Sequence, residues 1–365
     1  MGTWEKYPVD FWCNWEIDVG VKEIRRAIED GADVNAVNTY GYTPFMTVVR
    51  DRISSNDNPD VVKLMVEAGA DVNAKDIHGY SPIFWAARAV RSGELEILRL
   101  LIEAGADVNA RNDSNSTPLM MAGSAESVNM LVDAGADINA KNDWGQTVLM
   151  EVLDPPNPPS VSAVRTLIRL GADVQARDEK GITALMYAAH LHSGAVKVLI
   201  EAGADVNAQS SQGTTALMAA VTSIENNTAM DQCQYEIDRS IEAINTLIES
   251  GANVNATDNN GKTALMYAVS NWYSAQTVNA LISAGADINV KDRDGRTALM
   301  YATDNDVDVT VTQTLIKAGT DVNAKDKHGR TALDYALEKK NASTVNVLKA
   351  AGMNEGGRQH PVSTS

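Results

Sequence analysis

The stretch Gly69-Ala70-Asp71-Val72-Asn73-Ala74-Lys75-Asp76-Ile77-His78-Gly79 decides the fold, because close copies of it recur along the chain. In each copy, a Gly that can end a helix lies ten residues before the position that opens the next unit. The first Gly is Gly31, Gly69, Gly105, Gly135, Gly171, Gly203, Gly251, Gly285 or Gly319. The opening position is Gly41, Gly79, Asn115, Gly145, Gly181, Gly213, Gly261, Gly295 or Gly329, Asn115 being the one departure. Self-similarity at a period of about 33 residues predicts a solenoid of stacked units.

Each unit has the pattern of two helices followed by an extended finger. A Thr after the opening position can cap a helix, and Pro44 and Pro82 suit the first helical turn, where a missing N–H costs nothing. Apolar residues then recur at helical spacing in a second segment, as at Val61, Leu64 and Met65, before the next Gly ends it. One unit cannot bury its own apolar face, so stacked neighbours must build the core.

Differences in unit length are confined to the helix pair. The finger keeps its length, whereas the distance from the opening position to the next helix-ending Gly varies between 20 and 38 residues. We therefore expect insertions at the turn between the two helices, the largest at Ser223 to Asp238 and smaller ones at Ser54 to Asp60 and Asp154 to Ser160. Two interpretations of these insertions stay open. They are either loop variation that the fold tolerates or a second edge of the protein that contacts a partner.

The recurring tract resembles that of the ankyrin repeat, over roughly Val19 to Gly352. The family's T-P-L-H-x-A tract has its counterparts in Thr43-Pro44-Phe45-Met46 and Thr117-Pro118-Leu119-Met120. Its His is absent, and Met stands there in all copies but those with Phe84 and Asp334, so apolar packing should replace a hydrogen bond. The resemblance implies an all-α ankyrin-repeat solenoid of helix-turn-helix units with projecting β-hairpin or loop fingers, about nine repeats and an N-terminal cap.

The expected organisation has three parts. Residues 1–40 are assigned to N-terminal capping helices and the first finger, 41–352 to the repeat array, and 353–365 to a disordered tail. Capped ends argue against end-to-end stacking, so a monomer is expected; pairing of two copies through the aromatic fingers is the alternative.

Composition narrows the class of partner. The net charge of −17 argues against nucleic acid and against an anionic membrane surface. The chain lacks an apolar run long enough for a transmembrane helix, and Met1 to Glu16 lacks a signal-peptide core. We expect a cytoplasmic protein, or a secreted one if a signal was removed before the given start.

A basic group in the last two fingers is either a charge-balanced face or an anion site; it comprises Lys291, Arg293, Arg296, Lys325, Lys327 and Arg330.

Catalytic chemistry has little support in the sequence. The P-loop, HExxH, GxSxG and paired CxxC motifs are absent, so we predict no enzyme activity and no cofactor. His190 and His192 form the one close histidine pair. The pair belongs either to a surface loop or to a metal site, and the lack of a third ligand nearby in the sequence favours the loop. The repeated Asp of the G-A-D tract serves the fold of the repeats, so none of these carboxylates is a candidate general acid or base.

The resemblance implies a function as well as candidate contact positions. Ankyrin repeats bind protein partners in a concave groove, through finger tips beside the opening Gly and through first-helix positions nine to eleven residues beyond it. Large aromatics on the fingers of the first four units, with nearby arginines, resemble interface hot spots. The predicted partner-binding residues are Tyr40, Tyr42, Arg50, His78, Tyr80, Arg88, Trp144, Gln146 and Trp272.

Other interpretations stay open beside this one. Tyr42 and Tyr80 could simply pack on a neighbouring finger, whereas Tyr267, Tyr301 and Tyr335, which follow the T-A-L tract, are expected to pack between helices. The Met-rich tract is similar to that of bacterial ankyrin arrays, and an effector delivered to a host cell would also act by binding. A small-ligand binder or enzyme that uses the sixth-unit insertion is the remaining alternative.

Overall fold

The computed structural model describes residues 21–51, 58–153, 161–191, 193–222, 233–270, 274–304 and 309–352. This described part is helical and holds no strand, only two isolated antiparallel bridges, between Lys141 and Thr147 and between Thr257 and Thr263. The predicted all-α solenoid is therefore confirmed. Of the expected N-terminal cap and first finger (1–40), residues 1–20 lie outside the described residues, as does the expected tail, 353–365. The chain divides into two compact units, Met1–Glu179 (unit 1) and Lys180–Ser365 (unit 2).

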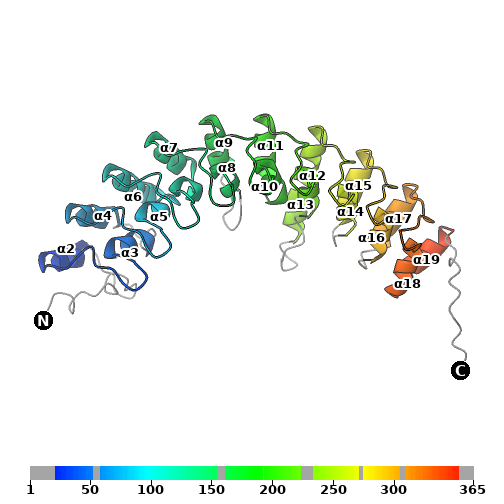
Figure 1. The fold of residues 1–365 in the computed structure, drawn as a ribbon, viewed down its shortest axis with the longest axis horizontal. Coiled ribbons are helices and arrows are strands. Elements are labelled where there is room, and N and C mark those ends of the chain that lie inside the picture. Colours follow the sequence, from blue (N-terminus) through cyan, green and yellow to red (C-terminus); the bar gives the residue numbers. More distant parts are fainter. Residues whose placement is uncertain are drawn as a thin grey trace, which may run out of the picture. The chain divides into compact units, whose positions relative to one another are not determined.

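Unit 1 consists of two layers of helices, labelled as in Figure 1. One layer holds the first helices, which contact one another in the order α3 (Pro44–Asp51), α5 (Pro82–Ala86), the 3-10 helix η2 (Pro118–Met121) and α8 (Val148–Glu151). The other holds α2 (Val21–Glu29), α4 (Asn58–Glu67), α6 (Ser92–Glu103), α7 (Ala125–Asp133) and α9 (Val161–Arg169).

Unit 2 repeats this arrangement. Its first helices are α10 (Ala184–Leu191), α12 (Ala216–Thr222), α14 (Ala264–Ala268), α16 (Ala298–Asp304) and α18 (Ala332–Glu338), each in contact with the next. Its second helices are α11 (Ser193–Glu201), α13 (Cys233–Glu249), α15 (Ser274–Ser283), α17 (Val309–Lys317) and α19 (Ala342–Ala350). In both units, each first helix is followed by a second helix, and a finger leads from one described pair to the next.

The core is built from the tract after each opening position. Phe45, Met46 and Ile83 are fully buried, as is Phe84 at the position where the family tract has His. The methionines that replace this His elsewhere are also buried, namely Met46, Met120, Met150, Met186, Met218, Met266 and Met300. Apolar packing between neighbouring repeats thus occupies this position, as the sequence predicts.

The expected threonine caps form in some repeats and not in others. The Oγ1 of Thr43 accepts a hydrogen bond from the backbone N–H of Met46 at 3.2 Å, and Thr331 forms a reciprocal capping box with Asp334. In contrast, the Oγ1 atoms of Thr117 and Thr147 are buried without a hydrogen-bond partner in the protein. The side-chain cap that the sequence allows is therefore absent in these two repeats, where apolar packing holds the short helix.

Side-chain amides fix the distance between neighbouring fingers. The Oδ1 of Asn35 accepts from the backbone N–H of Asp71 at 2.7 Å, and its Nδ2 donates to the carbonyl of Gly69 at 2.9 Å. The same pair of bonds joins Asn73 to Asp107 and Gly105, at 2.8 and 3.0 Å. The Asn of the G-A-D-V-N-A tract is thus a spacer that places each finger against the next.

The expected insertions fall only partly between the two helices of a pair. Asp154 to Ser160 falls between α8 and α9, whereas the last three residues of Ser54 to Asp60 already belong to α4. In the sixth unit, however, α13 already begins at Cys233 and runs for 17 residues. Part of that insertion therefore lengthens the second helix instead of the turn; residues 223–232 lie outside the described residues.

Candidate functional site

The tips of the first two fingers are held by turns built on one side chain each. The Oδ1 of Asn38 accepts hydrogen bonds from the backbone N–H groups of Tyr40 (2.9 Å) and Tyr42 (3.0 Å). Asp76 binds the N–H groups of His78 (2.9 Å) and Tyr80 (2.8 Å) in the same way. The aromatic side chains therefore project from a locally rigid loop, which lowers the entropy that a partner must overcome on binding.

The fingers also bind each other through the backbone at their tips. The N–H of Ile77 donates to the carbonyl of Tyr40 at 3.2 Å, and the N–H of Asp113 donates to that of His78 at 3.0 Å. The backbone N–H of Asp143 continues the series by donating to the carbonyl of Ser114 at 3.0 Å. The tips of unit 1 therefore form one continuous edge.

An aromatic cluster lies where the first two fingers meet α5. Trp85 lies 6.0 Å from the Tyr42 ring and stacks on the Tyr80 ring at 6.2 Å, while Phe84 meets Tyr80 edge-on at 5.2 Å. The guanidinium of Arg50 lies over the Tyr42 ring, 4.5 Å from its centroid. The expected pairing of arginine with aromatic side chains is thus present at Arg50.

This cluster also bears on the alternative that the two tyrosines serve packing. Tyr42 and Tyr80 are half-buried, both contact Trp85 of α5, and Tyr80 also contacts Phe84. Trp85 was not among the residues expected from the sequence. A signal was available, because it occupies the position after the Phe84 of the tract, where later repeats carry Tyr.

Two further aromatic tips of unit 1 are strongly exposed. Tyr40 is 61% exposed and Trp144, on the fourth finger, 55%. Ile77 on the second finger is 55% exposed and is bonded through its backbone to Tyr40. Exposed apolar side chains that lie next to one another mark an interaction patch, whereas single ones are ordinary on a protein surface.

The other predicted contact residues differ in their setting. His78 and Arg88 are exposed. Gln146 is only 7% exposed, and its Oε1 accepts a hydrogen bond from Asn142 Nδ2 at 2.9 Å, so it stiffens the fourth finger instead of facing a partner. Trp272 lies outside the described residues.

A second ordered cluster, in unit 2, joins α14, α16 and α18 to their fingers. The hydroxyl groups of Tyr267, Tyr301 and Tyr335 donate to finger carboxylates at 2.7 to 2.8 Å; the acceptors are Asp258, Asp292 and Asp326, respectively. Cations alternate with the rings. Arg296 lies 4.1 Å from the Tyr301 ring and 4.7 Å from that of Tyr335, and Arg330 lies 4.3 Å from the latter.

These contacts change the ionisation of the cluster. Burial, reinforced by the hydrogen bond to Asp292, raises the pKa of Tyr301 well above its ordinary value, and burial together with Asp326 raises the pKa of Tyr335 to about 12. Burial alone would raise the pKa of Asp326, but hydrogen bonds from Tyr335, the backbone and Arg330 outweigh it and lower this pKa.

The basic residues of this cluster are paired within the protein. Arg296 forms an ion pair with Asp304 at 2.7 Å, and Arg330 with Asp326 at 3.1 Å. For these two arginines the charge-balanced alternative fits better than an anion site. The expected packing of these tyrosines between helices stays a prediction; their rings contact cations beside the finger tips, and their hydroxyl groups tie each finger to its first helix.

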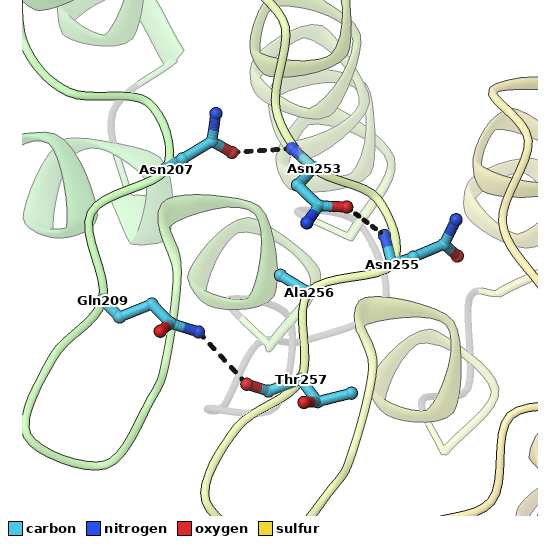
Figure 2. A pocket seen from close by; sticks show the side chains of 6 residues that line it. All are labelled: Asn207, Gln209, Asn253, Asn255, Ala256 and Thr257. Carbon is cyan, nitrogen blue, oxygen red and sulfur yellow. Dashed lines mark hydrogen bonds between the residues drawn. The ribbon is translucent and has the colours of Figure 1, made fainter.

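A polar pocket of about 450 Å³ lies between two fingers of unit 2 (Figure 2). Its lining residues are Asn207, Gln209, Asn253, Asn255, Ala256 and Thr257. The Oδ1 of Asn207 accepts from the N–H of Asn253 at 2.7 Å, and Gln209 Nε2 donates to the carbonyl of Thr257 at 3.1 Å. The first is the same spacer bond found between other fingers and the second joins the same two fingers, so the lining is part of the scaffold.

Neither a metal cluster nor a membrane-spanning helix is found in the part of the chain that the structure describes. Of the histidine pair, His190 lies on α10 with its Nδ1 at 3.4 Å from the carbonyl of Ala219. His192 lies outside the described residues.

Comparison with known proteins agrees with the geometry of the repeats. A family model described as ankyrin repeats in three copies matches residues 20–112, 53–142, 156–232, 227–292 and 270–356. No curated protein matches the sequence. The matched ranges together take in both layers of helices and the fingers of both units.

Proposed function

The chain belongs to the ankyrin-repeat family, and from that membership we propose that it is a non-enzymatic scaffold whose unit 1 binds a protein partner. Ankyrin repeats mediate protein–protein interaction in general, which sets the class of function. The proposed contact surface, here called the aromatic groove, consists of Tyr40, Tyr42, Tyr80, Trp85 and Trp144 together with the neighbouring cations Arg50, His78 and Arg88.

One observation carries this proposal: the exposure of large aromatics on rigid finger tips. Tyr40 and Trp144 are more than half exposed, although a finger turn needs only small or polar residues there. Tyr and Trp are the residues enriched at interface hot spots, because they bury a large area with few rotatable bonds. The net charge of −17 supports a protein partner over nucleic acid.

The test is a capture experiment followed by affinity measurement. Proteins retained from the source cell's lysate are identified by mass spectrometry, and the enriched partner is then titrated against wild type and a Tyr40→Ala, Trp144→Ala variant. We expect the variant to bind at least about 30-fold more weakly, since hot-spot truncations cost 2 kcal/mol or more.

A matched control separates the aromatic groove from general loss of apolar surface. Val161→Ala removes an exposed apolar side chain from α9 in the other layer of unit 1 and should leave affinity unchanged. Unchanged affinity in the double variant, with helicity retained by circular dichroism, would show that the aromatic groove is not the binding surface.

A further inference from the structure

We propose that the partner segment bound by the first two repeats is a proline-rich chain in the polyproline II conformation. It lies across the rings of Tyr42, Tyr80 and Trp85, here called the aromatic platform. This inference rests on the proposed function and deepens it, because it names the class of segment that this part of the aromatic groove binds. It relies on ring surfaces and neutral hydrogen-bond donors instead of on charged side chains.

The aromatic platform is fixed by contacts within the protein. The Trp85 ring lies 6.0 Å from the Tyr42 ring and 6.2 Å from the Tyr80 ring. Phe84, which is fully buried, meets Tyr80 edge-on at 5.2 Å, and the guanidinium of Arg50 stacks on Tyr42 at 4.5 Å. The rings are therefore in position before a partner arrives, which lowers the entropic cost of binding.

Three hydrogen-bond donors of the platform are unused within the described part of the chain. They are the hydroxyl groups of Tyr42 and Tyr80 and the indole N–H of Trp85, on side chains that are half-buried. By contrast, the tyrosines of α14, α16 and α18 donate their hydroxyl groups to finger carboxylates. A partner that covers the platform must supply acceptors, because a buried donor without one costs free energy.

A proline-rich chain offers such acceptors. Proline has no backbone N–H, so a chain rich in it presents carbonyl oxygens with few donors of its own. A helix has already used most of its carbonyl groups internally, and other extended chains bring an N–H at every residue, which the rings do not match with a row of acceptors. Docking of polyproline II segments on aromatic-lined grooves is a general mode of peptide recognition.

The size of the platform fits a short segment of this kind. The two steps between ring centroids, 6.0 and 6.2 Å, span at most about 12 Å, the rise of about four polyproline II residues. With three residues per turn, positions i and i+3 lie on one face of the segment. Two prolines three positions apart, or a proline and another apolar residue, would therefore both contact the platform.

The arrangement of the rings argues against a caged cation as the ligand. Quaternary ammonium groups bind where several ring faces close around them. Here the rings of Tyr80 and Trp85 stack on each other with their planes 27° apart, and Arg50 already occupies a face of Tyr42. The rings thus form a surface across which a chain can lie instead of a cage.

The experiment begins with selection from a phage library of random dodecapeptides on the full-length protein. We expect enriched sequences to carry two prolines, or a proline and an apolar residue, at positions three apart. The affinity of a selected peptide should change less than about twofold as NaCl rises from about 50 to about 500 mM, because ion pairs are not needed for its binding.

Substitutions in the platform test where the peptide binds. Tyr80→Phe removes one hydroxyl group and keeps the ring, so binding should weaken about three- to tenfold, the effect of one hydrogen bond. Trp85→Ala should weaken binding at least about tenfold, with helicity checked by circular dichroism. Tyr267→Phe is the matched control: it removes the same atom from α14 in unit 2 and should bind like wild type.

The contrary outcomes are distinguishable. Selected peptides without proline, whose binding is nevertheless lost in Trp85→Ala, would overturn the proline-rich partner and leave the platform as a binding surface. Proline-rich peptides that bind Tyr80→Phe and Trp85→Ala as tightly as wild type would overturn the platform as their site. If no peptide is enriched, this inference fails. The proposed function would still stand if a lysate protein captured by wild type is lost in the Tyr40→Ala, Trp144→Ala variant.

Discussion

At the scale of single residues, two kinds of glycine serve different purposes in each finger. Gly69 and Gly79 both have positive φ, +84° and +78°, which side chains other than Gly rarely adopt. A Cβ at Gly69 would meet nothing within 4 Å, whereas one at Gly79 would lie 2.9 Å from Asn112 Cα and 3.0 Å from the backbone N of Asp113. The opening glycine thus also allows close approach of the next finger.

This difference predicts unequal costs for the same substitution. Gly69→Ala should lower the free energy of unfolding by about 1–2 kcal/mol, the cost of the left-handed conformation alone. Gly79→Ala should cost clearly more, because the clash is with backbone that cannot move without shifting the neighbouring finger. Urea titration of both variants measures this, and equal losses would show that the contact between fingers adapts freely.

Asn115 shows why one opening position can depart from glycine. Its φ is +57°, a conformation that Asn tolerates better than most residues. Its Nδ2 donates to Asp143 Oδ1 at 2.6 Å, and its carbonyl accepts from Arg111 at 2.6 Å. The side-chain bond to Asp143 on the next finger, which glycine could not make, thus compensates for the strained position.

At the scale of elements, the tyrosines of α14, α16 and α18 tie each first helix to its finger. Tyr335 is 3% exposed, donates to Asp326 and accepts from Arg330, whereas Tyr267 is only half-buried. We predict that Tyr335→Phe lowers the free energy of unfolding of unit 2 by about 1–3 kcal/mol, as expected when a buried polar group loses its partner. Tyr267→Phe should cost less.

The dependence of the unfolding free energy on pH tests the same contact independently. Because the pKa of Asp326 is lowered in the folded state, its ionised form contributes stability above its unfolded pKa of about 3.9, and this is lost as pH falls below that value. Tyr335→Phe removes one of the bonds that lower this pKa. Its unfolding free energy should therefore fall less steeply below pH 4 than that of wild type; an identical pH dependence would contradict the assignment.

At the scale of the whole molecule, stability should be distributed along the stack. In a solenoid each helix pair contacts its neighbours alone, so unfolding free energy is close to a sum of local terms. We predict that Gly79→Ala speeds amide hydrogen exchange in unit 1 and Tyr335→Phe in unit 2, with additive effects in the double variant. Exchange measured by mass spectrometry would contradict this if either substitution loosened both units equally.

Much of the architecture follows from the sequence by itself. The paired positions ten residues apart predict the helix-ending turn and the finger, because only Gly and a few residues like Asn115 adopt positive φ. Spacing of Val61, Leu64 and Met65 predicts the second helix. These features are local, so they can be recognised without knowing which segments meet in space.

Other features depend on contacts between repeats and were decided by the tertiary structure. Trp85 joins Tyr42 and Tyr80 into one cluster because α5 packs beside α3, which the positions of these residues in the sequence do not show. Gln146 fits the pattern of a contact residue, yet it is buried in the folded stack, where Asn142 of the same finger donates a hydrogen bond to its side chain. The sequence by itself determined the repeat and its turns through local backbone preferences; only the packing of one repeat on the next decided which finger side chains remain exposed to a partner.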